Sequence, residues 1–218
     1  TSFRQEYAGL RIYRGFDWNR NSARRKPQRT DVPSDFLLPS GENLAVVLNS
    51  LNFKLETWSQ IKQAMAKLLP DFLDIQFQVL GSQILIYFAM RGCAAPIGIS
   101  RLSDGTLNYL SLLAILLHPN PPGLICIEEP EAGLHPDMIG DLARHIEDAA
   151  TRTQVVITTH SDLLVSALSH RPEAIIVVER GENGTELTRL EPARLAGWLE
   201  KYRLGELWSM GEIGGNRW

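Results

Sequence analysis

GLICIEEPEAGLHP, residues 123–136, joins a short apolar run to two adjacent carboxylates. The run from Leu124 to Ile127 is bounded by turn residues and is too short for a normal buried helix, which predicts a strand covered on both faces. Glu128 and Glu129 then stand at the carboxyl end of this strand, the edge where an open α/β sheet binds ligands. Two carboxylates are costly to desolvate, so we expect a divalent metal with phosphates there. The alternative is that both lead into a solvated loop.

The segments on either side of this stretch extend the same pattern. Upstream, RLSDGTLNYLSLLAILLHP (residues 101–119) places a Ser-Asp-Gly-Thr turn directly before an apolar helix. Downstream, TQVVITTHSDLL (residues 153–164) is a second apolar strand that ends in Thr-Thr-His-Ser. With a helix over 136–150 and a third strand over 174–179, the order predicts right-handed crossovers and a mainly parallel sheet.

Composition is that of an ordinary globular protein. The chain has 218 residues, of which 44% are hydrophobic and 22% charged, enough for one large domain or for one domain and a small appendage. No apolar run reaches the length of about 18 residues that a membrane span needs, and no secretory signal pattern is present, so we expect a cytoplasmic protein with no membrane association. The net charge of −3 neither requires nor excludes nucleic acid.

The first 98 residues show other patterns. Residues 1–18 predict a strand entering a loop, and residues 72–90 predict a β-hairpin around Gly81-Ser82. Apolar residues at three- and four-residue steps over 44–68 predict one or two amphipathic helices. Residues 20–29 predict a loop or disordered connection, either solvated or in contact with nucleic-acid phosphates, because almost nothing in them is apolar and five residues are basic: Arg20, Arg24, Arg25, Lys26 and Arg29. We therefore expect two regions, 1–98 and 99–218.

The turn before the apolar helix supports two interpretations. Ser103 is a suitable N-cap for the periodic helix that follows, which is a purely structural role. Gly105 lies in the first turn, where its missing side chain lets a ligand approach the backbone, and the helix N-terminus favours a phosphate. One helix can be capped and bind an anion at the same time.

In sequence order, these motifs resemble the C-terminal lobe of an ABC-type ATPase head, and within that superfamily the RecF/SMC-like ATPases often labelled AAA-family. The resemblance is strongest over residues 98–180. It implies an α/β P-loop NTPase fold, with a mainly parallel sheet flanked by helices and a β-hairpin and helical N-terminal part. It also implies ATP and Mg²⁺ as cofactors, and a homodimer in the ATP state.

The resemblance assigns roles by position. Ser103, Asp104 and Gly105 match the signature motif, whose Ser103 and Gly105 contact the γ-phosphate held by the opposite subunit. Glu128 matches the Walker B carboxylate that supports Mg²⁺, and Glu129 matches the base that polarises water. The D-loop corresponds to residues 132–135, ending at His135, and the switch histidine to His160. This pair of carboxylates suits phosphoryl transfer, which depends on positioning and charge neutralisation.

The sequence departs from the family pattern in three places. Glu128 replaces the more usual Asp, and His135 stands where many relatives have Asp. No G-x-x-x-x-G-K-S/T phosphate loop occurs anywhere in the chain. The sequence therefore predicts half of an ATPase head, with an N-terminal Walker A lobe missing, and we expect the chain alone to bind ATP poorly and to be inactive.

Other functions remain open at this point. DNA maintenance, repair and phage defence all use such heads, with DNA or a partner nuclease as further partners. A non-hydrolysing interaction or regulatory module is an alternative because the phosphate loop is missing. A metal-dependent nuclease using Glu128, Glu129, Glu131 and Asp137 is another, although the Asp-x-Asp of TOPRIM-type nucleases is absent from residues 174–184.

Overall fold

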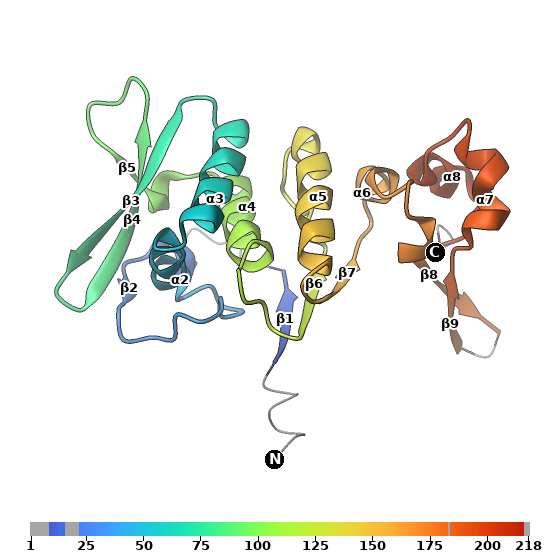
Figure 1. Ribbon diagram of the computed structural model, residues 1–218, viewed down its shortest axis with the longest axis horizontal. Coiled ribbons are helices and arrows are strands. Elements are labelled where there is room, and N and C mark those ends of the chain that lie inside the picture. Colours follow the sequence, from blue (N-terminus) through green and yellow to red (C-terminus); the bar gives the residue numbers. More distant parts are fainter. Residues whose placement is uncertain (1–8, 16–21, 183, 216–218) are drawn as a thin grey trace, which may run out of the picture. The chain divides into compact units, whose positions relative to one another are not determined.

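The computed structural model describes residues 9–15, 22–182 and 184–215 and falls into two compact units, Thr1–Thr158 and Thr159–Trp218 (Figure 1). Phe16, Trp18 and Arg20, which belong to the predicted N-terminal loop and basic segment, lie outside the described residues.

The first unit contains a three-stranded sheet with the strand order β1-β6-β7. β6 (Leu124–Glu128) pairs in parallel with β1 (Leu10–Arg14) on one side and with β7 (Gln154–Thr158) on the other. The 3₁₀ turn Pro136–Met138 and α5 (Ile139–Ala150) form the crossover from β6 to β7. The predicted parallel pairing of these two strands is confirmed, and β1 adds a neighbour from the first 98 residues.

The helices of the first unit surround one central helix. α4 (Asp104–Leu116) is buried at every residue from Thr106 to Leu116, as expected for a helix that is apolar on nearly all sides. The predicted helical stretch over 44–68 forms two helices, α2 (Leu44–Asn52) and α3 (Leu55–Leu68), and both pack against α4.

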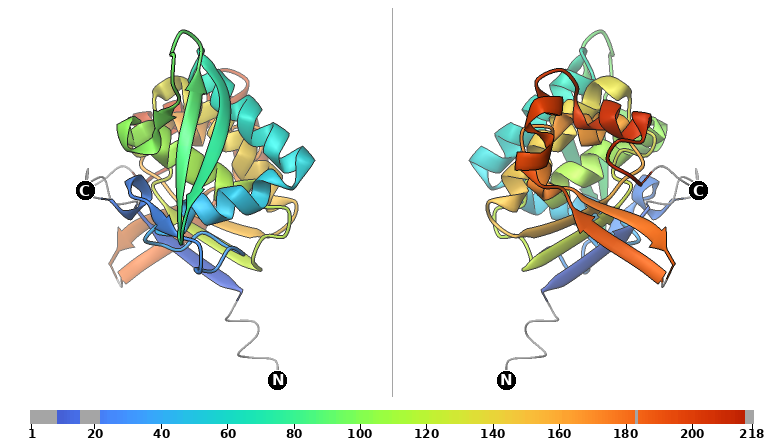
Figure 2. Two further views of the ribbon diagram at one scale, coloured as in Figure 1. Left: turned by 90° about the vertical axis from the view of Figure 1, so that its left-hand side faces the viewer. Right: turned by 90° about the vertical axis from the view of Figure 1, so that its right-hand side faces the viewer.

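The predicted hairpin over 72–90 is also confirmed. β3 (Phe72–Leu80) and β4 (Gln83–Met90) pair antiparallel, and the short strands β2 (Gln28–Arg29) and β5 (Ile97–Gly98) add to β4. This second sheet packs against α2 and α3, as the side view shows (Figure 2). The hairpin lies outside the parallel sheet, as the sequence predicts.

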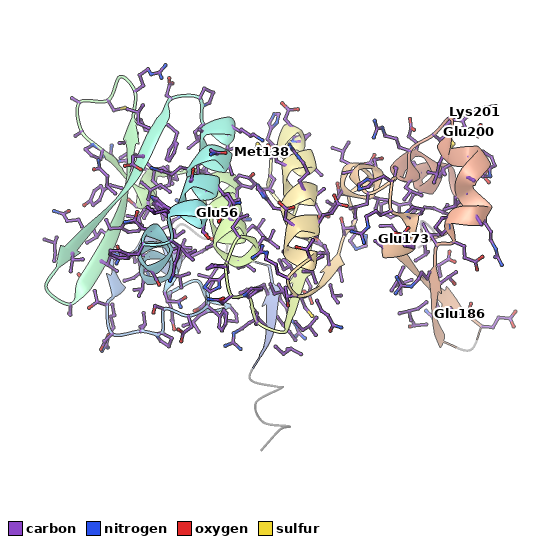
Figure 3. All side chains as sticks on the ribbon, in the orientation of Figure 1. Glu56, Met138, Glu173, Glu186, Glu200 and Lys201 are labelled. Atoms are coloured by element: carbon purple, nitrogen blue, oxygen red, sulfur yellow. The ribbon has the colours of Figure 1, made fainter. Side chains whose placement is uncertain are left out.

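The second unit has its own core. Its elements are α6 (Asp162–Ala167), the 3₁₀ turn Pro172–Ala174, β8 (Ile176–Gly181), β9 (Gly184–Arg189), α7 (Pro192–Leu199) and α8 (Leu204–Met210). The buried cluster consists of Val165, Val177, Leu190, Leu195, Leu204 and Leu207. In the hairpin of β8 and β9, Glu179 and Glu186 stand opposite each other in the strand register. The side chain of Glu186 faces solvent (Figure 3).

Two expectations about organisation differ from the structure. The predicted strand over 174–179 forms as β8, but it pairs antiparallel with β9 and is not part of the parallel sheet. Only a short turn separates β8 from β9, so pairing them has a lower loop-closure entropy cost than pairing β8 with a distant strand. The compact units divide after Thr158 and not near residue 98, because β1 pairs with β6 and both α2 and α3 pack on α4.

The basic segment, over its described part 22–29, is not a solvated or disordered loop. Arg24 and Arg25 belong to a 3₁₀ turn, Ala23–Arg25, and are 1% and 9% exposed. Both bond to groups of the first unit, so the prediction that they contact nucleic acid or solvent is wrong. Arg29 is exposed and pairs with Asp31.

Within the described residues, no helix combines the length and the apolar character that a membrane span requires.

His145 on α5 gives the first unit a pH-dependent stability. Its ring lies 6.4 Å from that of Tyr109 on α4. Burial lowers the pKa of His145, the charges of Lys67 and Arg144 lower it further, and Asp148 opposes them. Burial also lowers the pKa of His118. The protonated forms therefore favour the unfolded chain, whose histidines have a pKa of about 6.5.

We expect the free energy of unfolding to be fully present above about pH 6.5 and to fall as the pH is lowered toward 5. Urea denaturation at several pH values measures this slope. His145→Gln, which removes one of the two histidines whose pKa burial lowers, should make the slope shallower. An unchanged slope would contradict the assignment of the effect to His145.

Candidate functional site

Glu128 lies where β6 ends, between the ends of two other parallel strands. The sheet register places it beside Arg14 of β1 and Thr158 of β7. Arg14 Nε is 3.6 Å from Glu128 Oε1, and both side chains are more than half exposed, so this ion pair contributes little to stability. The carboxylate is therefore at the open carboxyl edge that the sequence predicts.

Glu129 leaves the strand in a left-handed backbone conformation. Its φ is +43°, the only positive φ at a non-glycine position among the described residues. The Glu129 N–H still donates to the Thr158 carbonyl at 2.9 Å, so the pairing with β7 continues through the turn. A left-handed L-residue costs about 1–2 kcal/mol, and such strain concentrates at functional sites. This turn, and not strand alternation, sets where the Glu129 side chain points.

A pocket of about 270 Å³ opens at this edge of the sheet. Three segments line it: the end of β1, one residue of α4, and the chain from β6 into the following loop. The lining residues are Tyr13, Arg14, Gly15, Asn108, Ile127, Glu128, Glu129, Pro130 and Ala132. The Tyr13 hydroxyl donates to the Leu37 carbonyl at 2.9 Å, and burial raises the pKa of Tyr13 to about 12.

The Ser-Asp-Gly-Thr turn, residues 103–106, begins α4 with a side-chain cap. Ser103 Oγ accepts from the Thr106 N–H at 3.1 Å and lies 2.8 Å from Thr106 Oγ1. The N-cap interpretation of Ser103 is confirmed. Asp104 pairs with the guanidinium of Arg25.

This turn is in close contact with residues 132–135, the segment predicted to be a D-loop. A Cβ atom on Gly105 would lie 2.4 Å from the Gly133 carbonyl oxygen. Asn108 Nδ2 donates to the Ala132 carbonyl at 3.3 Å. We expected a ligand to approach the Gly105 backbone, but on the Cβ side of this residue the structure places the backbone of Gly133.

The two histidines have different local settings. His135 Nδ1 accepts from the Asp137 N–H at 3.3 Å and caps the 3₁₀ turn before α5. His160 follows β7 by two residues and belongs to the second unit, so its role near the γ-phosphate stays a prediction. The adjacent Ser161 caps α6 by accepting from the Leu164 N–H at 3.2 Å.

The donor set of the pocket suits magnesium held together with phosphates. Mg²⁺ is typically bound through one or two carboxylates, with phosphate oxygens and water completing the shell. Glu128 and Glu129 supply those carboxylates. Over the part of the chain that the structure describes, no three His, Cys, Asp or Glu side chains are grouped to hold a metal by themselves, so Glu128, Glu129, Glu131 and Asp137 do not form the cluster of the nuclease alternative.

Sequence reasoning missed Arg14 and Asn108 as pocket residues. Asn108 interrupts the apolar face of α4 and is 3% exposed. A polar amide within an otherwise apolar helix was the signal in the sequence that could have identified it. Arg14 carried no signal, because only the register of β1 with β6 brings it to Glu128.

Residues 9–166 match the family described as "AAA domain, putative AbiEii toxin, Type IV TA system". The chain belongs to this family. Membership supports a general ATPase role, and ATP with Mg²⁺ is the family-level expectation for the cofactors.

Solved structures similar to this AAA-domain protein include three SMC heads. One, from work on ATP-driven dimerization and DNA-stimulated activation of SMC ATPases, has 17% identity and a TM-score of 0.50 over 71% of this chain and 96% of that one. An Smc head bound to the C-winged helix domain of ScpA has 15% identity and a TM-score of 0.53, over 70% of this chain and 51% of that one. A Pyrococcus furiosus Smc head with an extended coiled coil, bound to the C-terminal domain of ScpA, has 17% identity and a TM-score of 0.51, over 71% and 39%.

At these identities the likeness concerns the fold, which is that of an SMC-type ATPase head. The AAA-domain chain spans about half, or less, of the two ScpA-bound Smc chains.

The backbone at position 129 predicts an unusual order of stabilities. Glu129→Gly and Glu129→Ala both remove the carboxylate and differ only in Cβ. We expect the glycine variant to be the more stable by about 1 kcal/mol, because glycine adopts positive φ without strain. Glu128 has an extended backbone, so Glu128→Ala should be more stable than Glu128→Gly. Urea denaturation of the four variants measures the two differences. If alanine is the more stable substitution at position 129 as well, the backbone strain at Glu129 is contradicted.

Gly105 and Gly140 form a second matched pair, because each is the second residue of its helix. Gly105→Ala should destabilise the first unit by about 1–3 kcal/mol through overpacking against Gly133. Gly140→Ala meets nothing within 4 Å and should stabilise by about 0.4–1 kcal/mol. Thermal or urea unfolding compares the two variants. If Gly105→Ala leaves the free energy of unfolding unchanged, residues 132–135 move to accommodate the methyl group, and the close packing is not a constraint.

Proposed function

We propose that this chain is the C-terminal part of an ATP-hydrolysing, SMC/RecF-like head, which works by ATP-driven homodimerisation. The observation that carries the proposal is the pocket at the end of β6. It combines Glu128, the strained Glu129 and Ala132 of the D-loop with Asn108 from the helix that Ser103 caps. This arrangement supports the proposal because the residues that match the Walker B, catalytic and D-loop positions line one pocket, together with a residue of the helix that begins at the proposed signature turn.

In this proposal each residue has a separate role. When bound, ATP would supply the phosphoryl group, and Mg²⁺ would neutralise the charge that develops during its transfer. Glu128, whose present partner is Arg14, would hold the metal. Glu129 orients a water molecule and accepts its proton at a carboxylate oxygen. Ser103 and Gly105 would contact the nucleotide of the other subunit, Gly105 on a side other than the one that Gly133 covers, with Asp104 between them. His135 would lie in the D-loop, and His160 would contact the γ-phosphate.

A phosphate loop outside these residues completes the proposed site. Among the described strands, β7 pairs only with β6, and Val156 on it is 52% exposed. An open strand edge with an exposed apolar side chain is a template for another strand. This supports the pairing of a Walker A lobe, from elsewhere in the same protein or from another chain, alongside β7.

The proposed setting is the cytoplasm, in DNA maintenance, repair or phage defence, with DNA or a nuclease as further partners. Two of the similar SMC heads were solved with ScpA domains, so accessory proteins bind heads of this fold. A non-hydrolysing regulatory module derived from such an ATPase is the second candidate, favoured by the absence of a phosphate-loop sequence from the 218 residues.

Two variants of the completed head test the mechanism. Glu129→Gln should retain ATP binding and lower turnover by about 10²–10⁴-fold, because an amide positions water but does not accept its proton. The ATP-bound dimer should therefore accumulate. Ser103→Arg should prevent dimer closure and leave ATP binding by a single subunit intact. Turnover assays and sedimentation with ATP measure these effects.

Glu56→Gln and Ser59→Arg are the matched controls, since both residues of α3 are exposed. Figure 3 labels Glu56. Both controls should behave as the unaltered head. A Glu129→Gln head that stays monomeric with ATP, or a Ser103→Arg head that dimerises and hydrolyses normally, would overturn the shared-site mechanism. A completed head that binds ATP without turnover would favour the regulatory module.

A further inference from the structure

Arg25 bonds to both sides of Ser103. Its Nη1 donates to the Leu102 carbonyl at 2.7 Å and to the Ser100 carbonyl at 3.2 Å. Its Nη2 pairs with the Asp104 carboxylate. The Arg25 side chain is 6% exposed, and 75 or more residues separate it from these partners along the chain.

We propose that Arg25 is a positioning residue that fixes Ser103 for its contact with the γ-phosphate across the dimer. The proposal rests on the proposed function for the identity of the ligand, but the contacts that carry it belong to this chain alone. A guanidinium presents five donors in a rigid planar fork, which suits acceptors on successive residues. By holding residues 102 and 104, Arg25 limits the motion of the residue between them.

The neighbouring arginine anchors the same 3₁₀ turn to the body of α4. Arg24 Nη1 donates to Asn108 Oδ1 at 2.8 Å and to Ser111 Oγ at 3.3 Å. Asn108 in turn donates to the Ala132 carbonyl of the D-loop. Arg25 therefore extends from a turn that is itself held in place, and the signature turn and the D-loop are connected to one support.

Burial makes the Arg25 contacts specific to arginine. Buried hydrogen bonds to charged groups are strong, and removing one partner leaves the other desolvated and unsatisfied. A lysine at position 25 keeps the charge but offers a single ammonium, without a planar fork, to three separated acceptors. Arg25→Lys therefore tests geometry and not charge.

Hydrogen–deuterium exchange of the 218-residue chain tests the positioning without nucleotide. The N–H groups of Thr106 and Leu107 bond to the Ser103 hydroxyl and carbonyl, so their protection reports how firmly Ser103 is held. Arg25→Lys should speed their exchange by about 10–100-fold, the loss expected for charge-assisted bonds. Exchange of α5, residues 139–150, should stay unchanged. Arg29→Lys, at an exposed arginine paired only locally with Asp31, should change neither.

A second variant covers the case in which Arg25→Lys fails to fold. Asp104 is 43% exposed, and Asp104→Asn removes only the charged acceptor of Arg25, so it should speed exchange of Thr106 and Leu107 in the same direction but less. Unchanged exchange at both amides in the folded variants, or equal acceleration throughout α5, would overturn the positioning role.

The completed head separates this inference from the proposed function. Arg25→Lys should weaken ATP-dependent dimerisation by about tenfold or more and leave Mg-ATP binding by the monomer within about twofold. If the unaltered head does not dimerise with ATP, the proposed function fails while the exchange result stands. If it dimerises and Arg25→Lys dimerises equally well, the positioning role is wrong.

Discussion

Parallel pairing of β6 on both of its edges is the constraint on which the site depends. β6 is the internal strand, hydrogen-bonded to β1 and β7, and its residues from Leu124 to Ile127 are apolar and buried or half-buried, so its first polar residue comes at its last paired position. That point is Glu128. The chain must then turn out of the sheet at once, and it does so through the left-handed conformation of Glu129. The two carboxylates differ in backbone geometry because one closes the strand and the other opens the loop.

The second level of organisation is backbone contact between loops. The carbonyl of Gly133 occupies the space that a side chain on residue 105 would take, and Asn108 donates to the adjacent Ala132 carbonyl. The turn at residues 103–106 and the segment 132–135 are held together by close packing that leaves no room for a methyl group on residue 105. Ion pairing contributes little at this edge, since Arg14 and Glu128 are both well solvated.

Much of this arrangement was predictable from local patterns. The apolar runs of β6 and β7, the periodic helices α2, α3 and α4, and the hairpin at Gly81 are each specified within one short segment, as is the cap at Ser103. Contacts between distant segments were not predictable. Five loosely alternating residues gave no sign that β1 pairs with β6, and the partner of Gly105 depends on a loop 28 residues further along the chain. Composition was misleading at Arg24 and Arg25, because a basic segment with little apolar content is ordinarily solvated, whereas here both guanidinium groups are buried among acceptors.

The fit between Arg24 and Gly41 has a consequence for sequence variation in this family. Gly41 has a φ of +70°, and a Cβ atom there would lie 2.3 Å from Cγ of the buried Arg24. The aliphatic stem of the arginine therefore occupies the volume that any other residue at position 41 requires. Two positions that are 17 apart in the chain are in this way constrained as a pair. In an alignment of relatives, a side chain should become acceptable at position 41 only where position 24 carries a shorter residue, and where the backbone has also relaxed to negative φ.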